Sequence, residues 1–159
     1  STYATGDMLY ATGANTLGKL TAGADSTVIR YIGGVPTVGP VVSSSTFIPT
    51  FSNPTNVTDQ TFQEGYYQRT GNIVIGYITM LIDPTTALTQ TNLEFTPPVA
   101  SNFAVGTDCT GFISCIGAGD ASNGHLASSV ANDTIVISFV AGAAASNGTY
   151  RLDFMYKIL

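Results

Sequence analysis

Charged side chains are scarce in this chain. Asp, Glu, Lys and Arg make up only 9% of its 159 residues, against about a quarter in an average globular protein. The five basic residues are scattered along the chain, which excludes the basic patch that nucleic-acid binding requires. A net charge of −5 also argues against attachment to anionic membranes. With so few charges, the surface should consist of Ser, Thr, Asn and Gly with apolar patches, which suits burial against other copies of the chain or a stable extracellular particle.

Residues suited to catalysis and metal binding are scarce as well. There is no Trp, and the single histidine, His125, follows Asp120 and Ser122 in a polar loop. These three residue types can form a catalytic triad, but we interpret His125 as an exposed loop residue. Cys109 and Cys115 lack the spacing of a zinc site; we predict small buried residues, and a disulfide across a tight turn stays open. We predict no enzyme, no cofactor and no metal.

Long hydrophobic runs and helical patterns are both absent. No run reaches the roughly 18 apolar residues that a membrane-spanning helix needs, so we expect no membrane insertion. Short segments with period-two alternation, separated by Gly, Asn, Asp and Pro, are typical of strands and turns. They predict an all-β protein whose body is an antiparallel, jelly-roll-like β-sandwich.

The chain is predicted to consist of an arm, a linker and a body. Residues 1–40 alternate very short apolar runs with Gly, Asn, Asp and Thr, and they repeat the tetrapeptide Tyr-Ala-Thr-Gly. A two-stranded piece of this kind is marginally stable alone in water. We therefore predict an extended N-terminal β arm at 1–40 that must take its core from the rest of the chain or from other chains, and that serves in trimerisation or virion docking. Pro, Gly and Ser then predict a linker at 41–46, followed by the C-terminal β-sandwich at 47–159.

The longest apolar segment, residues 73–82, predicts a strand that is apolar on both faces. One face carries Ile73, Ile75, Tyr77 and Leu81, and the other carries Val74, Ile78, Met80 and Ile82. One face should pack in the core, and the other must be covered by a second layer or a neighbouring subunit. We therefore expect a homotrimer, with subunit or docking contacts made by residues of the arm and of this strand: Met8, Leu9, Tyr10, Leu17, Ile78 and Met80.

The end of the chain predicts a hairpin. Residues 134–141 and 149–158 both alternate apolar and polar positions, and Asn147-Gly148 between them is a strong hairpin turn signal. The second of these strands should turn Tyr150, Leu152, Phe154 and Tyr156 toward the core and present its other face to solvent.

Several segments resemble fibre-like virion proteins of tailed bacteriophages. Residues 6–17, followed by Leu20, resemble a GDLLYATGANTL-x-x-L segment of that family. In the body, residues 67–74, 98–103 and 108–111 resemble the motifs YMRVGNVV, PVASNF and DCAG in the same order. The resemblance covers nearly the whole chain and implies a homotrimer that projects from the tail, baseplate or head of the particle.

The resemblance further implies a non-enzymatic virion structural protein, a trimeric fibre or spike that displays its β-sandwich on the particle surface. Its partners would be its own copies, capsid or tail proteins, and a host cell-surface glycan or protein. The residues expected to face a receptor lie in two polar loops: Asn123, Gly124, His125, Asn147 and Gly148. Two alternatives stay open: a capsid-bound head-fibre or decoration protein that stabilises the shell, and a polysaccharide-cleaving spike domain.

Overall fold

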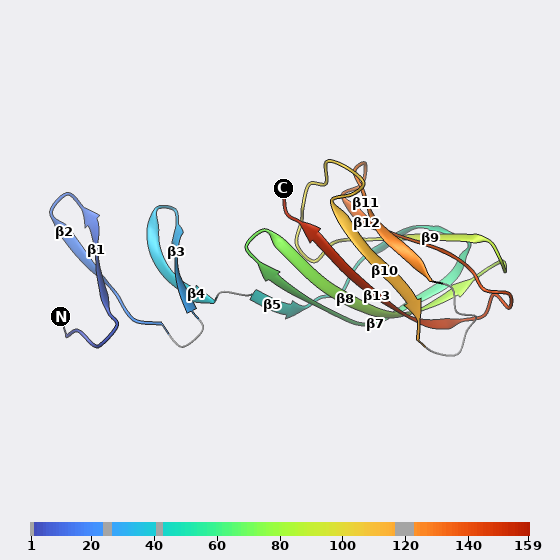
Figure 1. Cartoon of the computed structure of the whole chain (residues 1–159), viewed down its shortest axis with the longest axis horizontal. Coiled ribbons are helices and arrows are strands. Elements are labelled where there is room, and N and C mark those ends of the chain that lie inside the picture. Colours follow the sequence, from blue (N-terminus) through green and yellow to red (C-terminus); the bar gives the residue numbers. More distant parts are fainter. Residues whose placement is uncertain (1, 24–26, 41–42, 117–122) are drawn as a thin grey trace. The chain divides into compact units, whose positions relative to one another are not determined.

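The computed structural model describes residues 2–23, 27–40, 43–116 and 123–159 (Figure 1). In these ranges every regular element is a β-strand, which confirms the all-β prediction. The chain divides into two compact units, Ser1–Ser43 and Ser44–Leu159. The boundary falls within the segment predicted as a linker, and each unit is described by itself.

The first unit consists of two separate hairpins, each a two-stranded antiparallel sheet. The first hairpin pairs β1 (Met8–Gly13) with β2 (Thr16–Leu20), and the second pairs β3 (Thr27–Ile32) with β4 (Val35–Pro40). Gly33 and Gly34 form the two-residue turn of the second hairpin, both with positive φ, 56° and 82°. Two successive positive φ angles are typical of a type I′ turn, which favours glycine at both positions.

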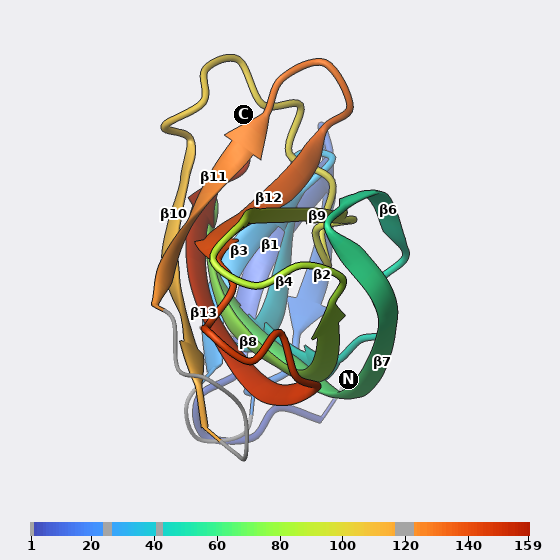
Figure 2. The same cartoon turned by 90° about the vertical axis from the view of Figure 1, so that its right-hand side faces the viewer.

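The second unit is built on one sheet of nine strands in its described residues, in the order β5-β7-β8-β13-β10-β11-β12-β9-β6. The pairs from β7 to β6 are antiparallel. The sheet curls into a half-barrel (Figure 2). Its strands are β5 (Ser43–Thr46), β6 (Phe51–Thr55), β7 (Val57–Thr70), β8 (Ile73–Pro84), β9 (Gln90–Phe95), β10 (Cys109–Cys115), β11 (Gly124–Ser129), β12 (Thr134–Val140) and β13 (Gly148–Lys157).

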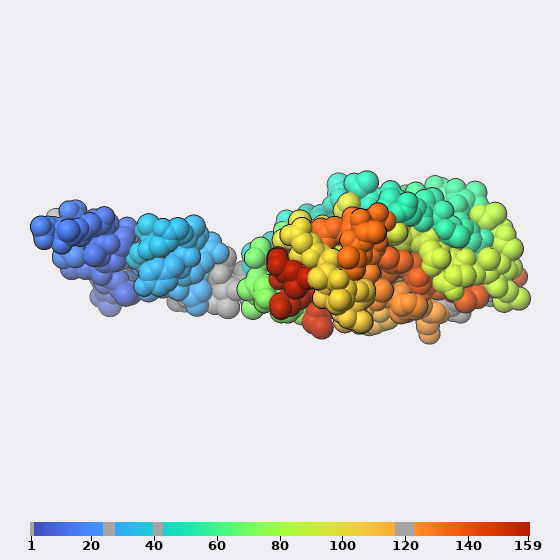
Figure 3. All heavy atoms as spheres, turned by 90° about the horizontal axis from the view of Figure 1, so that it is seen from above, coloured from blue at the N-terminus to red at the C-terminus, as the bar shows by residue number. Residues whose placement is uncertain are grey.

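The concave inner face of this sheet encloses the core. Alternate residues of the strands point inward, and aromatic rings from different strands meet there. The Phe154 ring lies 5.7 Å from the Phe95 ring and 6.1 Å from the Phe47 ring, measured between centroids. In the space-filling view the strands of this unit form one continuous packed body (Figure 3). The core side chains are Val74, Ile78, Met80, Ile82, Leu93, Phe95, Phe103, Cys109, Ile113, Leu126, Ile135, Ile137, Phe139, Tyr150, Leu152, Phe154 and Tyr156.

Asn56 joins the two ends of the sheet order. It is the single residue between β6, at one end, and β7, near the other, and its φ of 58° is one that Asn tolerates well. Its side-chain amide donates to the Thr86 carbonyl (3.0 Å) and to the Thr91 hydroxyl (2.8 Å). Its side-chain oxygen accepts from the Thr86 N–H (2.7 Å). Asn56 thus holds the connection from β8 to β9 against the β6–β7 corner.

Two sequence predictions about β8 and the linker require correction. Ile78 and Met80 are 0% exposed and belong to the core of their own chain, so a partner chain cannot reach them. The period-two pattern grouped the faces of β8 correctly, but the face that contains Ile75 and Tyr77 is the one left uncovered. Residues 43–46, predicted as linker, form strand β5 next to β7.

The predicted C-terminal hairpin is also wrong. β12 pairs with β11 and β9, whereas β13 pairs with β8 and β10, so the two strands are not neighbours. Asn147 is exposed, and Gly148 is a buried strand residue rather than a turn residue. The alternation within β13 is confirmed, because Tyr150, Leu152, Phe154 and Tyr156 are at most 2% exposed.

Candidate functional site

The arm hairpins are the first candidate interaction surface, because they expose their apolar side chains. In the described part of this unit, none of the large apolar side chains belongs to a buried core. Of the predicted contact residues, Met8, Leu9 and Leu17 are 49%, 53% and 67% exposed. Tyr10 is half-buried, and its ring lies over Gly18, the residue with which it pairs. Met8, Leu9 and Leu17 are therefore available to a partner.

Both faces of each arm hairpin are apolar. The register places Leu9 and Leu17 on one face of the first hairpin, and Met8 and Leu20 on the other. In the second hairpin, Val28, Ile32 and Val35 share one face, and Ile29 and Tyr31 share the opposite one. Each hairpin therefore presents uncovered apolar side chains on both of its faces.

Asp7 is held as an anion at the base of the first hairpin. Its carboxylate accepts hydrogen bonds from the N–H groups of Ala4 (2.8 Å) and Ala22 (3.0 Å), and it contacts Lys19 Nζ at 3.2 Å. The backbone hydrogen bonds, from Ala4 first and Ala22 second, lower the pKa of Asp7 to about 2. Asp7 and Lys19 neutralise each other. Arg30 is then the one charged residue of the described arm outside this ion pair.

The outer face of the body sheet is the second candidate surface. We use this name for the outward side chains of β7, β8, β13 and β10 that carry large apolar groups. Ile75, Phe112 and Met155 are 54%, 57% and 45% exposed, and Tyr66 is 36% exposed. The register places Tyr66, Tyr77, Asp153, Phe112 and His125 in one row across five adjacent strands.

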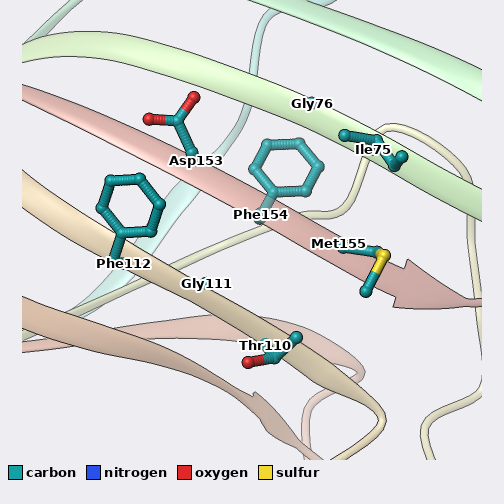
Figure 4. A pocket seen from close by; sticks show the side chains of 8 residues that line it. All are labelled: Ile75, Gly76, Thr110, Gly111, Phe112, Asp153, Phe154 and Met155. Carbon is teal, nitrogen blue, oxygen red and sulfur yellow. The ribbon is translucent and has the colours of Figure 1, made fainter.

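A groove of about 380 Å³ crosses this outer face. Phe112 and Asp153 line one side, and Ile75, Thr110 and Met155 line the other (Figure 4). In the row between the two sides, Phe154 pairs with Gly76 on β8 and with Gly111 on β10. A Cβ on Gly76 would lie 2.5 Å from Phe154 Cζ, so glycine is needed there for the inward packing of the Phe154 ring.

A preorganised polar cluster adjoins the groove. The Arg151 guanidinium lies 4.2 Å above the centre of the Tyr77 ring and 3.1 Å from the Asp153 carboxylate. The Tyr77 hydroxyl donates to Glu64 Oε1 at 2.9 Å. The hydrogen bond to Asp153 raises the pKa of Arg151, and the hydrogen bond to Glu64 raises the pKa of Tyr77. Arg151 therefore stays cationic and Tyr77 stays neutral, and each already has a partner within the chain.

The predicted receptor loops are only partly exposed. Asn123 and Asn147 are exposed, Gly124 begins β11, and His125 lies on the outward side of β11 opposite Phe112. Gly148 is buried at the start of β13, so its assignment to a receptor-facing loop is wrong. Residues 117–122, which include Asp120 and Ser122, lie outside the described residues.

The two cysteines cannot bond to each other. Cys109 and Cys115 begin and end the same extended strand, β10, and a disulfide requires Cα atoms within about 7 Å. Cys109 is 2% exposed, as predicted, and its burial raises the pKa of the thiol to about 12.

Among the described residues, no three or more His, Cys, Asp or Glu side chains gather in a way that could hold a metal ion. In the same part of the chain, no helix has the length and hydropathy needed to cross a bilayer.

The sequence reasoning missed the outer face of the body sheet. The prediction that the face of β13 containing Met155 is exposed is confirmed, since Met155 is 45% exposed, but neither Met155 nor Phe112 was assigned to a site. The available signal was their position: each is a large apolar residue at a place in its strand where alternation predicts an outward side chain.

No family model matches the chain, and no curated protein matches its sequence. Among solved structures, the reovirus attachment protein sigma1, crystallised in complex with alpha-2,3-sialyllactose, is similar with a TM-score of 0.40 and 6% identity. The match covers 99% of this chain and 98% of that chain. A TM-score this low does not establish a shared fold.

Proposed function

We propose that this chain is a non-enzymatic structural protein of a tailed-bacteriophage virion. Three copies assemble through their N-terminal arms and display the β-body on the particle surface, where it attaches to a glycan or protein of the host. The resemblance of residues 6–17 to a recurring segment of phage fibre proteins supports the virion assignment. The observation that carries the assembly is the absence of a core in the described part of the arm.

The energetics of the arm support assembly with other chains. Ordering a residue costs roughly 1–2 kcal/mol of backbone entropy, which buried apolar surface must offset. The arm leaves its large apolar side chains exposed, for example Tyr31 at 74% and Leu17 at 67%, so it has little to offset that cost. The body encloses its own core, so its buried apolar surface offsets the entropy cost of ordering it. Copies of the arm supply matching apolar faces and little charge repulsion.

Light scattering on the purified full chain tests the assembly. We expect a mass of three chains at micromolar concentration, and a shift toward the single chain when Leu9→Ser and Leu17→Ser are combined. Leu88→Ser is the matched control, because Leu88 is 73% exposed on the body and outside both candidate surfaces. A monomeric wild-type chain, or equal effects of the arm and control variants, contradicts the proposal.

Imaging of the intact particle tests the place of display. A position on the head, with a copy number close to the number of capsomers, would favour the decoration alternative, in which the arm binds the shell. Density at the tail or baseplate would favour the fibre or spike. Glycan hydrolysis by the purified chain would contradict the non-enzymatic assignment.

A further inference from the structure

We infer that the outer face of the body sheet, on β7, β8, β13 and β10, is a contact surface for the body of a second copy of this chain. The inference rests on the proposed arm-driven assembly and adds a second contact to it. The arm supplies the attraction between chains, and the outer face fixes how their bodies pack.

One sheet carries two different outward surfaces. On β7, β8, β13 and β10 the outward side chains include four large groups that are 36% to 57% exposed, Tyr66, Ile75, Phe112 and Met155. On β11, β12 and β9 they are mainly small or polar, with Val136 and Val140 as apolar exceptions: His125, Ala127, Ser129, Ser138, Asn92 and Glu94. Small and polar side chains of this kind are expected on a surface that faces only solvent. A contiguous exposed apolar patch marks a site of interaction.

The residue types on the outer face are those of a protein–protein interface. Interface cores are enriched in Tyr, Phe, Met and Arg relative to the remaining surface, whereas Lys, Glu and Asp are depleted. Near the centre of this face the acidic exceptions are Asp153 and Glu64, which accept hydrogen bonds from Arg151 and Tyr77. The centre of the outer face holds Tyr77, Phe112, Met155 and Arg151 in adjacent strands. This composition favours a protein partner over a charged or highly hydrated ligand.

Arg151 and Asp153, near the centre of the outer face, form an ion pair before any partner binds. Removing an unpaired charge from water is costly, but Arg151 is already paired with Asp153 at 3.1 Å and stacked on the Tyr77 ring. The Tyr77 hydroxyl likewise has Glu64 as its acceptor at 2.9 Å. A partner surface can therefore cover the Arg151–Asp153 pair without separating its two charges, while Glu64 keeps the hydrogen bond from the Tyr77 hydroxyl.

The area of the outer face suits a contact that is weak alone. Four strands spaced about 4.8 Å apart, each extending roughly 30 Å, span on the order of 600 Å². Stable complexes bury about 800 Å² on each partner. The body begins directly after the arm, so associated arms would hold bodies at an effective concentration of order millimolar. At that concentration a small interface is occupied, which identifies the tethered copy as the partner.

Hydroxyl-radical footprinting of the full chain, read by mass spectrometry, tests this contact. The reference is the arm variant that combines Leu9→Ser with Leu17→Ser, in which the bodies are separate. We expect Phe112 and Met155 to be oxidised at least about threefold more slowly in the assembled wild type than in that reference. Leu88 and Val105, 73% and 53% exposed elsewhere on the body, should react equally in both.

Equal oxidation of Phe112 in the assembled and separated chains overturns the inference while leaving the arm-driven assembly intact. Protection that appears only after a host polysaccharide is added also overturns it and assigns the outer face to a glycan. If the wild-type chain does not assemble at all, the proposed assembly fails and this contact fails with it.

A variant of the outer face gives a second, independent measure. Phe112→Ser combined with Ile75→Thr removes two exposed apolar side chains and keeps a β-branched residue in β8. We expect the concentration at which the assembly half-dissociates to rise by at least about tenfold, as the loss of that apolar burial implies. Leu88→Ser should leave it unchanged, and all three proteins should unfold at the same urea concentration. An unchanged dissociation midpoint contradicts the inference.

Discussion

Removal of a single hydroxyl group, in Tyr156→Phe, should destabilise the body by about 1–3 kcal/mol. The Tyr156 hydroxyl donates to the Val99 carbonyl at 2.7 Å and accepts from the Val99 N–H at 3.0 Å. These two bonds hold the connection between β9 and β10 against β13. Each contributes roughly 0.5–1.5 kcal/mol net. Tyr156 is 1% exposed, and phenylalanine preserves its edge contact with Phe103, so the loss reports the hydroxyl alone.

Urea unfolding of the full chain, followed by circular dichroism of the body transition, measures this change. Tyr66→Phe is the matched control, because the Tyr66 side chain is 36% exposed and its hydroxyl has water available. The reasoning is refuted if Tyr156→Phe costs less than about 0.5 kcal/mol, since two lost hydrogen bonds should cost more. It is also refuted if the control loses as much.

The same residue makes the stability of the body sensitive to alkali. Burial raises the pKa of Tyr156 well above its ordinary value of 10.0, so the folded chain keeps a proton that the unfolded chain releases. This contribution is fully present below pH 10 and is lost as pH rises through the folded pKa. Tyr156→Phe should flatten that decline. The remaining slope should come from Cys109, whose pKa burial raises from 9.0 to about 12, and from Tyr77, whose pKa the hydrogen bond to Glu64 raises.

Three further predictions concern single positions. Gly76→Ala should cost about 1–3 kcal/mol, because its Cβ would lie 2.5 Å from the Phe154 ring; Gly106→Ala, with its nearest atom at 3.7 Å, should be tolerated in the same urea assay. Asn56→Ala should lower the free energy of unfolding by a similar amount, seen as a lower urea midpoint, because it removes the hydrogen bonds of the β6–β7 corner. The stabilising contribution of ionised Asp7 should be present above pH 4 and lost as pH falls through about 2; an NMR titration of its two backbone donors that shows a midpoint near 4 would contradict this.

The alternation of apolar and polar residues was sufficient to predict the strands but not which strands pair with each other. Period-two alternation identified the inward face of β13, because burial on one side of a strand is written directly into every second residue. It could not show that β12 and β13 are separated by β10 and β11. The turn signal at Asn147-Gly148 suggested a hairpin. Between β12 and β13, however, the chain passes β11 and β10 to reach another place in the sheet, and Gly148 pairs with Ile82 of β8.

The orientation of β8 shows a second limit of sequence patterns. Both of its faces carry large apolar residues, so alternation divides the residues into two sets without showing which set points inward. That choice depends on the curl of the sheet and on the Phe154 ring, which occupies the space that Gly76 leaves inside. The site prediction therefore selected Ile78 and Met80, which are buried, and omitted Ile75, which is exposed.

The two candidate surfaces differ in what each must contribute to an assembly. The body encloses a core without a partner, so a contact on its outer face adds orientation but is not required for folding. The described arm has no such core, so in the proposed assembly its partners would supply most of the free energy that orders it. Loss of Leu9 and Leu17 should therefore dissolve the assembly. Loss of Phe112 and Ile75 should weaken it and free the bodies to move while the arms stay associated. A chain with few charges can combine the two contacts because neither depends on ion pairs formed between copies.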